Sequence, residues 1–426
     1  MRKLTGFLPL IVASAALVFV ATTQAAAKNA EVAEVGPRRE AAEPAGPATA
    51  FKVYEWGVAT QHWQGGEDTR FDGDVPAAYY EASEVPVDST PEPEPQPKPD
   101  PKPDPGPIRP RKPVLYFDCA RNVTFDLSVI FSSGKMTWMY PKPTKRSAEG
   151  TAVWSGIRLH SDSVEELRTG PAPKLLDVPA DHWANYSREA SNSSIEIGGE
   201  RERFLFYEGE AAPTLELDIA LNDKGDFVLR NFSAYPIYDF GATLRVAGKA
   251  SFVVVPEIPS ASGETPGEVT IGGKHVVQDV NIGKDLLAKQ CEAAGLTAAQ
   301  AKVFNRCWYN EFFGPMDDRT DHCYWYRRDP RALDASVALK LKLPAGFAAE
   351  FKRVGYVYVH GVDYDKLADF DKLVTDAVGG NTDSGDKLKK AGIAAMGAVR
   401  RALLDKDLPL KKRLELAKLL KSLTAK

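Results

Sequence analysis

The sequence contains few cysteine and histidine residues, and it contains no motif that identifies a catalysed reaction. Its 426 residues include only four cysteines and six histidines. No two histidines form an HxH or HExxH pattern, and no CxxC, G-x-S-x-G, P-loop or dinucleotide-binding fingerprint occurs. The chain therefore lacks the sequence signatures of common zinc hydrolases, esterases and nucleotide-binding enzymes. A Ser-His-Asp triad stays open, because triads assemble in space from distant residues.

The chain also lacks a surplus of positive charge. Its 54 Lys and Arg residues stand against 58 Asp and Glu residues, which leaves a formal net charge of -4. This balance predicts no nucleic-acid partner. A hydrophobic content of 43% with 10% aromatic residues is sufficient for a sizeable core in one or two domains.

The first 27 residues have the three parts of an export signal. Arg2 and Lys3 form a basic start, Phe7 to Ala21 is apolar, and Ala25 to Ala27 supplies small residues for cleavage. A retained membrane anchor is the alternative, but the apolar run is at the short limit for a span and no basic stop signal follows it. We therefore expect residues 1–27 to be removed and the mature chain to work outside the cytoplasm, in a periplasm or after secretion.

An extracytoplasmic location changes the interpretation of the four cysteines. Disulfide bonds persist in such compartments, whereas they are rare in the cytoplasm. We expect two bridges among Cys119, Cys291, Cys307 and Cys323. The positions weakly favour a Cys307–Cys323 pair, and the spacing gives little support to a structural zinc site.

Two segments are predicted to lie outside the regular fold. Residues 28–50 are rich in Ala, Glu, Pro and Gly without a hydrophobic period, which is typical of a disordered linker. Residues 88–113 carry Pro at nearly every second position, which favours a stiff polyproline II segment. The piece from Phe51 to Pro86 is too small to fold alone. We therefore expect it to dock into the main domain, so that the proline tract is an excursion from that domain.

The chain from residue 51 to residue 360 is dominated by strand patterns. Short segments that alternate bulky and polar residues are separated by turn residues, which predicts a mainly β fold, specifically an antiparallel β-sandwich. The expected strands are 51–57, 113–117, 123–129, 135–140, 203–207, 322–326, 335–343 and 354–359, and the expected hairpins are 215–232 and 243–256.

Two helical regions are expected within this pattern. A helical pair at about 284–313 is indicated by Gly295 as a helix stop and by a capping box of Thr297 and Gln300. We expect residues 361–426 to form a C-terminal helical region. Its last part, residues 385–426, has a net charge of +8 and an apolar helical period. We interpret it as a hairpin that packs on its own domain; contact of this basic tail with a membrane is the less favoured alternative.

Several segments resemble a family of secreted bacterial proteins. Phe51 to Thr60 reads FKVYEWGVAT and is similar to the YEWGTFT-like opening of that family. PVLYF at 113–117, WMYP at 138–141, FLFYE at 204–208 and the helix from Gly295 to Phe313 match its later segments in the same order. The chain departs from the family at Val58-Ala59 and at Asn310-Glu311. The family has no established activity, so the resemblance implies an architecture and carries over no catalytic residue.

Glu55 is the most suggestive single residue. A carboxylate between Tyr54 and Trp56 on an apolar strand is a candidate general acid with a raised pKa. Solvent, or an arginine partner on the same face, is the alternative interpretation. Asp321 and His322 are the other candidate catalytic residues. The acidic run from Asp317 to His322 lacks the spacing of a calcium loop, so we predict no metal and no cofactor.

Aromatic residues provide a second type of candidate site. Trp56, Trp308 and Trp325 are candidates for an exposed platform that stacks on sugar rings, whereas aromatic residues at this density are more often core. We therefore expect a binding or structural component of the cell envelope, with a glycan or another envelope component as its partner. The competing hypothesis is an extracytoplasmic hydrolase that acts on a glycan or another envelope polymer.

Overall fold

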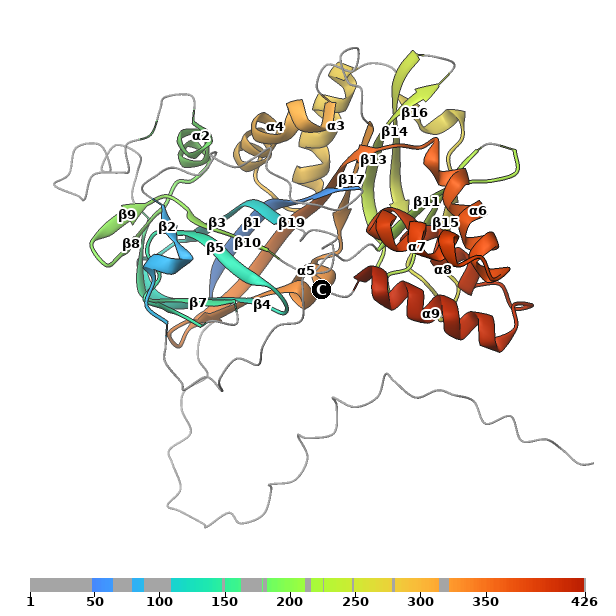
Figure 1. The fold of residues 1–426 in the computed structure, drawn as a ribbon. Coiled ribbons are helices and arrows are strands. Elements are labelled where there is room, and N and C mark those ends of the chain that lie inside the picture. The colour runs from blue at the N-terminus through green and yellow to red at the C-terminus, as the bar shows by residue number, and fades with distance from the viewer. Residues whose placement is uncertain are drawn as a thin grey trace, which may run out of the picture. The chain divides into compact units, whose positions relative to one another are not determined.

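The computed structural model describes residues 48–63, 79–87, 109–147, 150–161, 178, 182–210, 216–224, 226–246, 249–277, 280–313 and 322–424. The fold is mainly β, with antiparallel sheets and several helices (Figure 1). Within these residues, no helix has both the length and the apolar composition needed to cross a bilayer. The predicted signal peptide, residues 28–47 of the predicted linker and most of the proline tract lie outside the described residues.

A ten-stranded sheet forms the centre of the fold and consists of two halves. The N-terminal half contains β1 (Thr49–His62), β3 (Arg109–Cys119), β10 (Leu205–Glu210), β5 (Lys135–Tyr140) and β2 (Tyr80–Glu81), in that order. The C-terminal half contains β19 (Phe347–Val362), β17 (His322–Arg328), β13 (Ile237–Val246), β14 (Lys249–Ile258) and β16 (Val276–Val277).

The two halves meet where β1 pairs with β19. This pairing is parallel and continuous from Thr49 opposite Phe347 to His62 opposite His360. The other pairs of the sheet are antiparallel. Strands separated by almost 300 residues in the sequence therefore lie side by side in the middle of the sheet.

Two smaller sheets accompany the central one. One has the order β18 (Val337–Lys342), β4 (Val123–Phe131), β7 (Thr151–His160), β8 (Ser194–Ile197) and β9 (Glu200–Glu202), with β6 (Lys145–Arg146) paired to β7. The other consists of β11 (Leu217–Leu221), β12 (Phe227–Asn231) and β15 (Gly267–Thr270).

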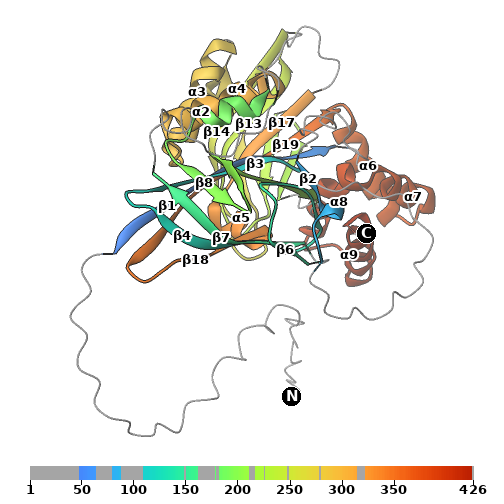
Figure 2. The same ribbon diagram turned by 90° about the vertical axis from the view of Figure 1, so that its left-hand side faces the viewer.

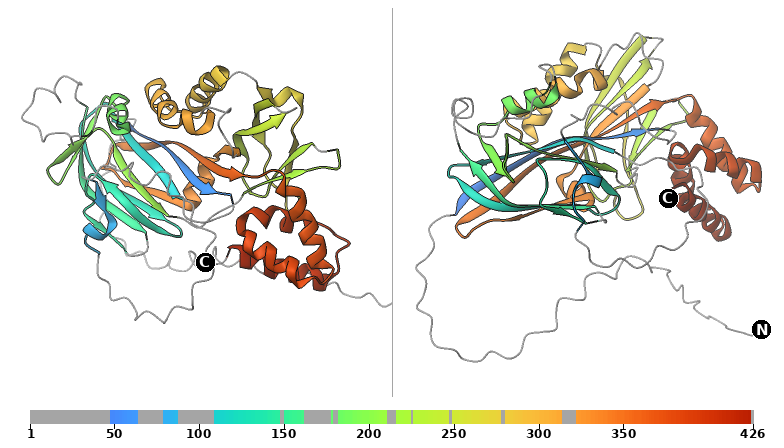
Figure 3. Two further views of the ribbon diagram at one scale, coloured as in Figure 1. Left: turned by 45° about the horizontal axis from the view of Figure 1, so that its top comes forward. Right: turned by 60° about the vertical axis from the view of Figure 1, so that its left-hand side comes forward.

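The helices occur in three groups. The first is α2 (Trp183–Glu189), α3 (Val280–Ala293) and α4 (Ala298–Phe313), the second is α5 (Pro330–Ser336) alone, and the third is α6 (Lys366–Val378), α7 (Thr382–Ala391), α8 (Met396–Leu403) and α9 (Leu410–Thr424). Short 3-10 turns lie at Ala82–Glu84, Gly273–His275 and Gly392–Ala395. Figure 3 shows the third group, in red, gathered beside the yellow-green strands.

Side-chain alternation along β1 divides the core between the two faces of the central sheet. Tyr54, Trp56 and Val58 point to one face and belong to a cluster that also includes side chains of α2, α3 and α4. Phe51 and Val53 point to the opposite face and share a cluster with side chains of β4 and β7. Figure 2 shows these helices and these strands on opposite sides of the sheet. A third cluster joins the C-terminal half of the sheet to β11, β12 and α6 to α9.

Much of the predicted pattern is confirmed. The strands that contain the segments 51–57, 113–117, 123–129 and 135–140 are present, as are both hairpins. The capping box is also present, because the Thr297 amide donates to Gln300 Oε1 at 3.0 Å and the Gln300 amide donates to Thr297 Oγ1 at 3.3 Å. The apolar residues of the C-terminal tail do pack on their own domain, since Leu388, Val399 and Leu416 are buried in the third cluster.

Two boundaries and the form of the C-terminal tail differ from the prediction. β1 begins at Thr49, within the predicted linker, because its parallel partner β19 extends to Phe347. β3 begins at Arg109, within the predicted proline excursion, because its backbone pairs with β1 as far as Thr60. The tail after α6 is a series of α7, a 3-10 turn, α8 and α9 instead of a single hairpin.

The structure contradicts the two predicted disulfide bridges. It contains no disulfide within the described residues, which include all four cysteines. Cys119 packs between the central sheet and β4, whereas Cys291 and Cys323 lie in the cluster on the opposite face. A bridge from Cys119 to either of them would have to pass through the sheet. The thiol of Cys323 accepts a hydrogen bond from Thr243 of β13 at 3.6 Å.

We predict four thiols in the denatured protein. Cys119, Cys291 and Cys323 are buried, and burial raises the pKa of the Cys291 thiol, which makes oxidation slow even outside the cytoplasm. Thiol titration in denaturant should count four groups per chain, and a reductant should leave the melting temperature unchanged. A count of two or none would contradict this arrangement.

Candidate functional site

The centre of the parallel strand pair carries a buried ion pair. Glu55 of β1 lies opposite Arg353 of β19, and both side chains point to the face of the sheet opposite Trp56. Arg353 Nε donates to Glu55 Oε2, and the Tyr207 hydroxyl of β10 donates to Glu55 Oε1. Glu55 is 5% exposed and Arg353 is 4% exposed. Both carboxylate oxygens are therefore engaged away from water.

Arg353 also connects the sheet to α5. Its Nη1 donates to Asp334 Oδ1 of α5 and to the carbonyl oxygen of Val337, at 2.8 Å for the carbonyl. The Asp334 side chain is 61% exposed, so it is the outer end of this network. The guanidinium thus holds together β1, β19 and the junction of α5 with β18.

The surroundings shift the pKa values of Tyr207 and Arg353 upward. Burial raises the pKa of the Tyr207 hydroxyl well above its usual value, and the neighbouring Glu55 carboxylate raises it further. Burial lowers the pKa of Arg353, but the combined effect of Glu55, Tyr207 and Asp334 is larger and raises it, so the net shift of the pKa is upward. At neutral pH Tyr207 is therefore a neutral donor and Arg353 a cation.

A cavity of about 110 Å³ lies beside this network, and we call it the Glu55 pocket. Its floor includes Gly57 and Gly355, which are opposite each other in the β1–β19 register. A Cβ atom on Gly57 would lie 3.0 Å from Pro113 Cα, and one on Gly355 would lie 2.5 Å from Leu333 Cδ2. Side chains at these two positions would crowd the walls, so the glycines leave room for the cavity.

The pocket lies between two clusters on the same face of the sheet. On β1, Phe51 and Val53 belong to the cluster with β4 and β7, whereas Ala59 packs against the cluster with the C-terminal helices. Glu55 and Gly57 stand between these positions. This face of the sheet has two covers: the strands β4 and β7 cover one part, and the C-terminal helices cover the other. The cavity lies between these two covers.

The lining of the pocket combines an apolar wall with a polar rim. Ser132 and Ser133, in the turn between β4 and β5, are exposed and form part of the rim. Arg328 lines another side, where its Nη1 donates to Ser336 Oγ at 2.9 Å and its Nε is 3.1 Å from both Glu216 carboxylate oxygens. The apolar wall includes Ala59, Pro113, Leu333, Val337 and Val357.

The candidate catalytic residues do not come together. Glu55 is paired with Arg353, which agrees with the alternative interpretation of this residue, an arginine partner on the same face. His322 pairs with Val362, nine residues beyond Arg353 along β19, which corresponds to about 30 Å at the rise of a strand. The His322 ring contacts Tyr364, with centroids 5.2 Å apart. Asp321 lies outside the described residues.

The structure contradicts the predicted tryptophan platform. Trp56 and Trp308 are 0% exposed and Trp325 is 2% exposed, and all three belong to the cluster beneath α3 and α4. Phe312 stacks on Trp325 with ring centroids 5.0 Å apart. Burial of a large aromatic area is more favourable than its exposure on a strand, so these side chains stabilise the core and cannot stack on a sugar.

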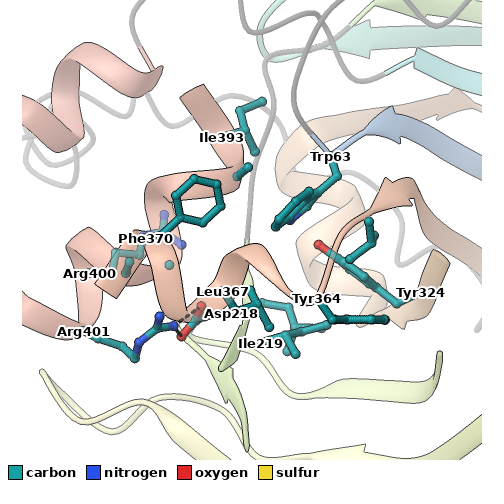
Figure 4. Close-up of a pocket in the computed structure, with 15 residues that line it drawn as sticks. Trp63, Asp218, Ile219, Tyr324, Tyr364, Leu367, Phe370, Ile393, Arg400 and Arg401 are labelled. Atoms are coloured by element: carbon teal, nitrogen blue, oxygen red, sulfur yellow. Dashed lines mark hydrogen bonds and ion pairs between the residues drawn. The ribbon is translucent and has the colours of Figure 1, made fainter. Parts of the chain in front are cut away.

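A second, smaller cavity of about 30 Å³ lies where the C-terminal helices pack on β11 (Figure 4). Arg401 of α8 donates to Asp218 Oδ1 of β11 at 2.6 Å and to Asp371 Oδ1 of α6 at 2.7 Å. Trp63, Phe370 and other apolar side chains fill the remaining wall. This volume suits one or two water molecules. We therefore interpret the cavity as a small gap in the packing of the helices on the sheet.

The described part of the chain contains no cluster of three or more His, Cys, Asp or Glu side chains placed to hold a metal ion. The chain matches no model of a known protein family and no curated protein. The assignment of a function to this chain therefore starts from its own geometry.

Sequence reasoning missed Arg353, Tyr207 and the two glycines of the pocket. One signal was available in the segment RVGYVYV at 353–359, because a charged residue begins a run of otherwise apolar strand. Such an arginine requires a buried partner. The partner itself was not identifiable, because β1 and β19 are far apart in the sequence.

We predict that Glu55→Gln lowers the free energy of unfolding by about 3–5 kcal/mol, because it leaves Arg353 as a buried charge without its carboxylate. Glu350→Gln is the matched control. Glu350 is an exposed residue of the same strand β19, and its substitution should change stability by less than about 0.5 kcal/mol. The measurement is denaturant unfolding of the three proteins. Equal stability of the two variants would show that the ion pair contributes little.

Proposed function

We propose that this protein is an extracytoplasmic binding protein whose Glu55 pocket accepts a small apolar group. The observation that carries the proposal is the cavity itself, which has a glycine floor, an aliphatic wall and an exposed serine rim. Pockets of this kind, apolar with a few fixed polar groups, are the usual form of small-molecule sites. The export signal predicted at residues 1–27 supports the location.

The size of the pocket restricts the ligand. An engineered apolar cavity of about 150 Å³ in another protein binds benzene. A volume of about 110 Å³ therefore suits a short acyl chain, a single ring or one apolar side chain of a partner. Because Ser132 and Ser133 are exposed at the rim, the remainder of a larger ligand would extend into solvent there.

The charges beside the pocket favour a neutral group. Arg353 is already bound by Glu55, Asp334 and the Val337 carbonyl, and Arg328 is bound by Glu216 and Ser336. A ligand carboxylate would have to displace Glu55 or Glu216 from an arginine, which leaves a buried carboxylate without its partner. These ion pairs hold the walls in place, and the ligand contributes an apolar surface.

We propose that the chain is a member of the secreted family that it resembles, and that the central sheet and the sheet of β4 and β7 form a β-sandwich around their shared cluster. We propose neither a glycan partner nor a hydrolase. The tryptophans are buried, and the β19 partners of Glu55 and His322, Arg353 and Val362, are about 30 Å apart along that strand.

Thermal unfolding with small apolar probes tests the pocket. At a free concentration about ten times the dissociation constant, benzene, indole or 1-hexanol should stabilise the wild-type protein by about 1.4 kcal/mol. Ala59→Leu places three more carbon atoms in the pocket and should abolish this stabilisation by the probe. Ala348→Leu adds the same atoms at an exposed position of β19 and should retain it.

The same variants distinguish two ways in which the proposal could fail. Stabilisation by no probe in the wild-type protein would contradict the proposal. Equal stabilisation of wild type and Ala59→Leu would show that the probes bind elsewhere.

A further inference from the structure

Helix α9 carries two apolar stripes on opposite sides. The inner stripe packs on the domain, with Leu416 at 3% and Leu423 at 2% exposure. The outer stripe consists of Leu410, Leu414 and Ala417, which follow one another at helical spacing. Leu410 is 73% exposed and Leu414 is 55% exposed. The inner stripe accounts for the packing of α9, so the outer stripe requires a separate explanation.

Lysines lie along one side of the outer stripe. Lys411 and Lys418 are exposed one position after Leu410 and Ala417, and neither has an ion-pair partner within the described residues. The helix contains five Lys and Arg residues against one Glu, a net charge of +4 in a chain whose total is -4. The single acid, Glu415, is 3.1 Å from Lys412 Nζ. Asp405 and Asp407, in the turn before the helix, are the nearby opposing charges.

We propose that the outer stripe of α9 docks on an anionic phospholipid bilayer. An amphipathic helix with leucines flanked by lysines lies in the membrane interface, where the apolar side chains enter the acyl boundary and the ammonium groups meet lipid phosphates. Lysines near such a surface are attracted by its negative potential. This proposal does not depend on the Glu55 pocket, which lies against β1 and β19.

The apolar part of the proposal is tested with lipid vesicles. The mature full-length protein is mixed with vesicles of phosphatidylglycerol and phosphatidylcholine, or of phosphatidylcholine alone, and bound protein is measured after sedimentation. Binding should require the anionic lipid. The double variant Leu410→Ser/Leu414→Ser should weaken binding about tenfold, because two exposed leucines no longer enter the bilayer.

Ile282→Ser is the matched control. Ile282 of α3 is 55% exposed, as is Leu414, but it lies outside the basic helix. This variant should bind as the wild-type protein does. Since all three residues are exposed, each variant should retain the wild-type melting temperature.

The electrostatic part has its own pair of variants. Lys411→Gln/Lys418→Gln should weaken binding to anionic vesicles about tenfold at low salt, with a smaller effect at high salt. Lys274→Gln/Lys340→Gln removes the same charge from exposed positions outside α9 and should have little effect.

Three results would overturn the proposal. One is equal binding of wild type and the leucine double variant to anionic vesicles. The second is equal binding of the wild-type protein to zwitterionic and anionic vesicles. The third is self-association of the wild-type protein without vesicle binding, lost in the leucine double variant, which would assign the stripe to a second copy of the chain.

Discussion

The arrangement depends on the Glu55–Arg353 ion pair across two parallel strands. β1 and β19 form the only parallel pair described in the central sheet, and each belongs to a different half of that sheet. The other pairs of the sheet are antiparallel and join segments that are closer in the sequence, such as Val114 with Phe206 and Ile237 with Arg328. Joining the two halves requires pairing of segments almost 300 residues apart, which carries a large loop-closure entropy. A buried charge pair at the centre of this join opposes a shift in register, because a shift of one residue would turn Glu55 toward the aromatic face and separate it from Arg353.

The same join creates the pocket. In the register that places Glu55 opposite Arg353, Gly57 lies opposite Gly355, so the floor of the cavity and the ion pair share one cause. The strands β4 and β7 cover one part of this face, and α6 to α9 with β11 cover the other. The pocket occupies the gap between these covers, where α5 and the Ser132–Ser133 turn form its walls. The outer stripe of α9 belongs to the second cover, so the proposed ligand site and the proposed membrane contact are separate surfaces of one domain.

The sequence predicted local features better than distant ones. The hairpins, the strand at 135–140 and the Thr297–Gln300 capping box depend on neighbouring residues, and all are present. α2, β8 and β9 were missed because they are short, with seven, four and three residues, and β7 was missed as well. For Glu55, alternation placed the side chain on the right face and allowed for an arginine partner, but no local signal pointed to residue 353. The tryptophan platform was predicted from the aromatic content, and the disulfides were predicted from the expected compartment. Both depend on how deeply these residues are buried, which the assembled sheet determines and the local sequence does not.

A double-mutant cycle between Glu55 and Arg353 tests this account most directly. The free energy of unfolding is measured by denaturant titration for the wild-type protein, Glu55→Gln, Arg353→Met and the double variant. If the ion pair holds the two halves of the sheet in register, the coupling energy should be about 2 kcal/mol or more, and the double variant should be more stable than the sum of the single effects implies. A coupling energy within about 0.5 kcal/mol of zero would contradict the account, because the two residues would then contribute independently.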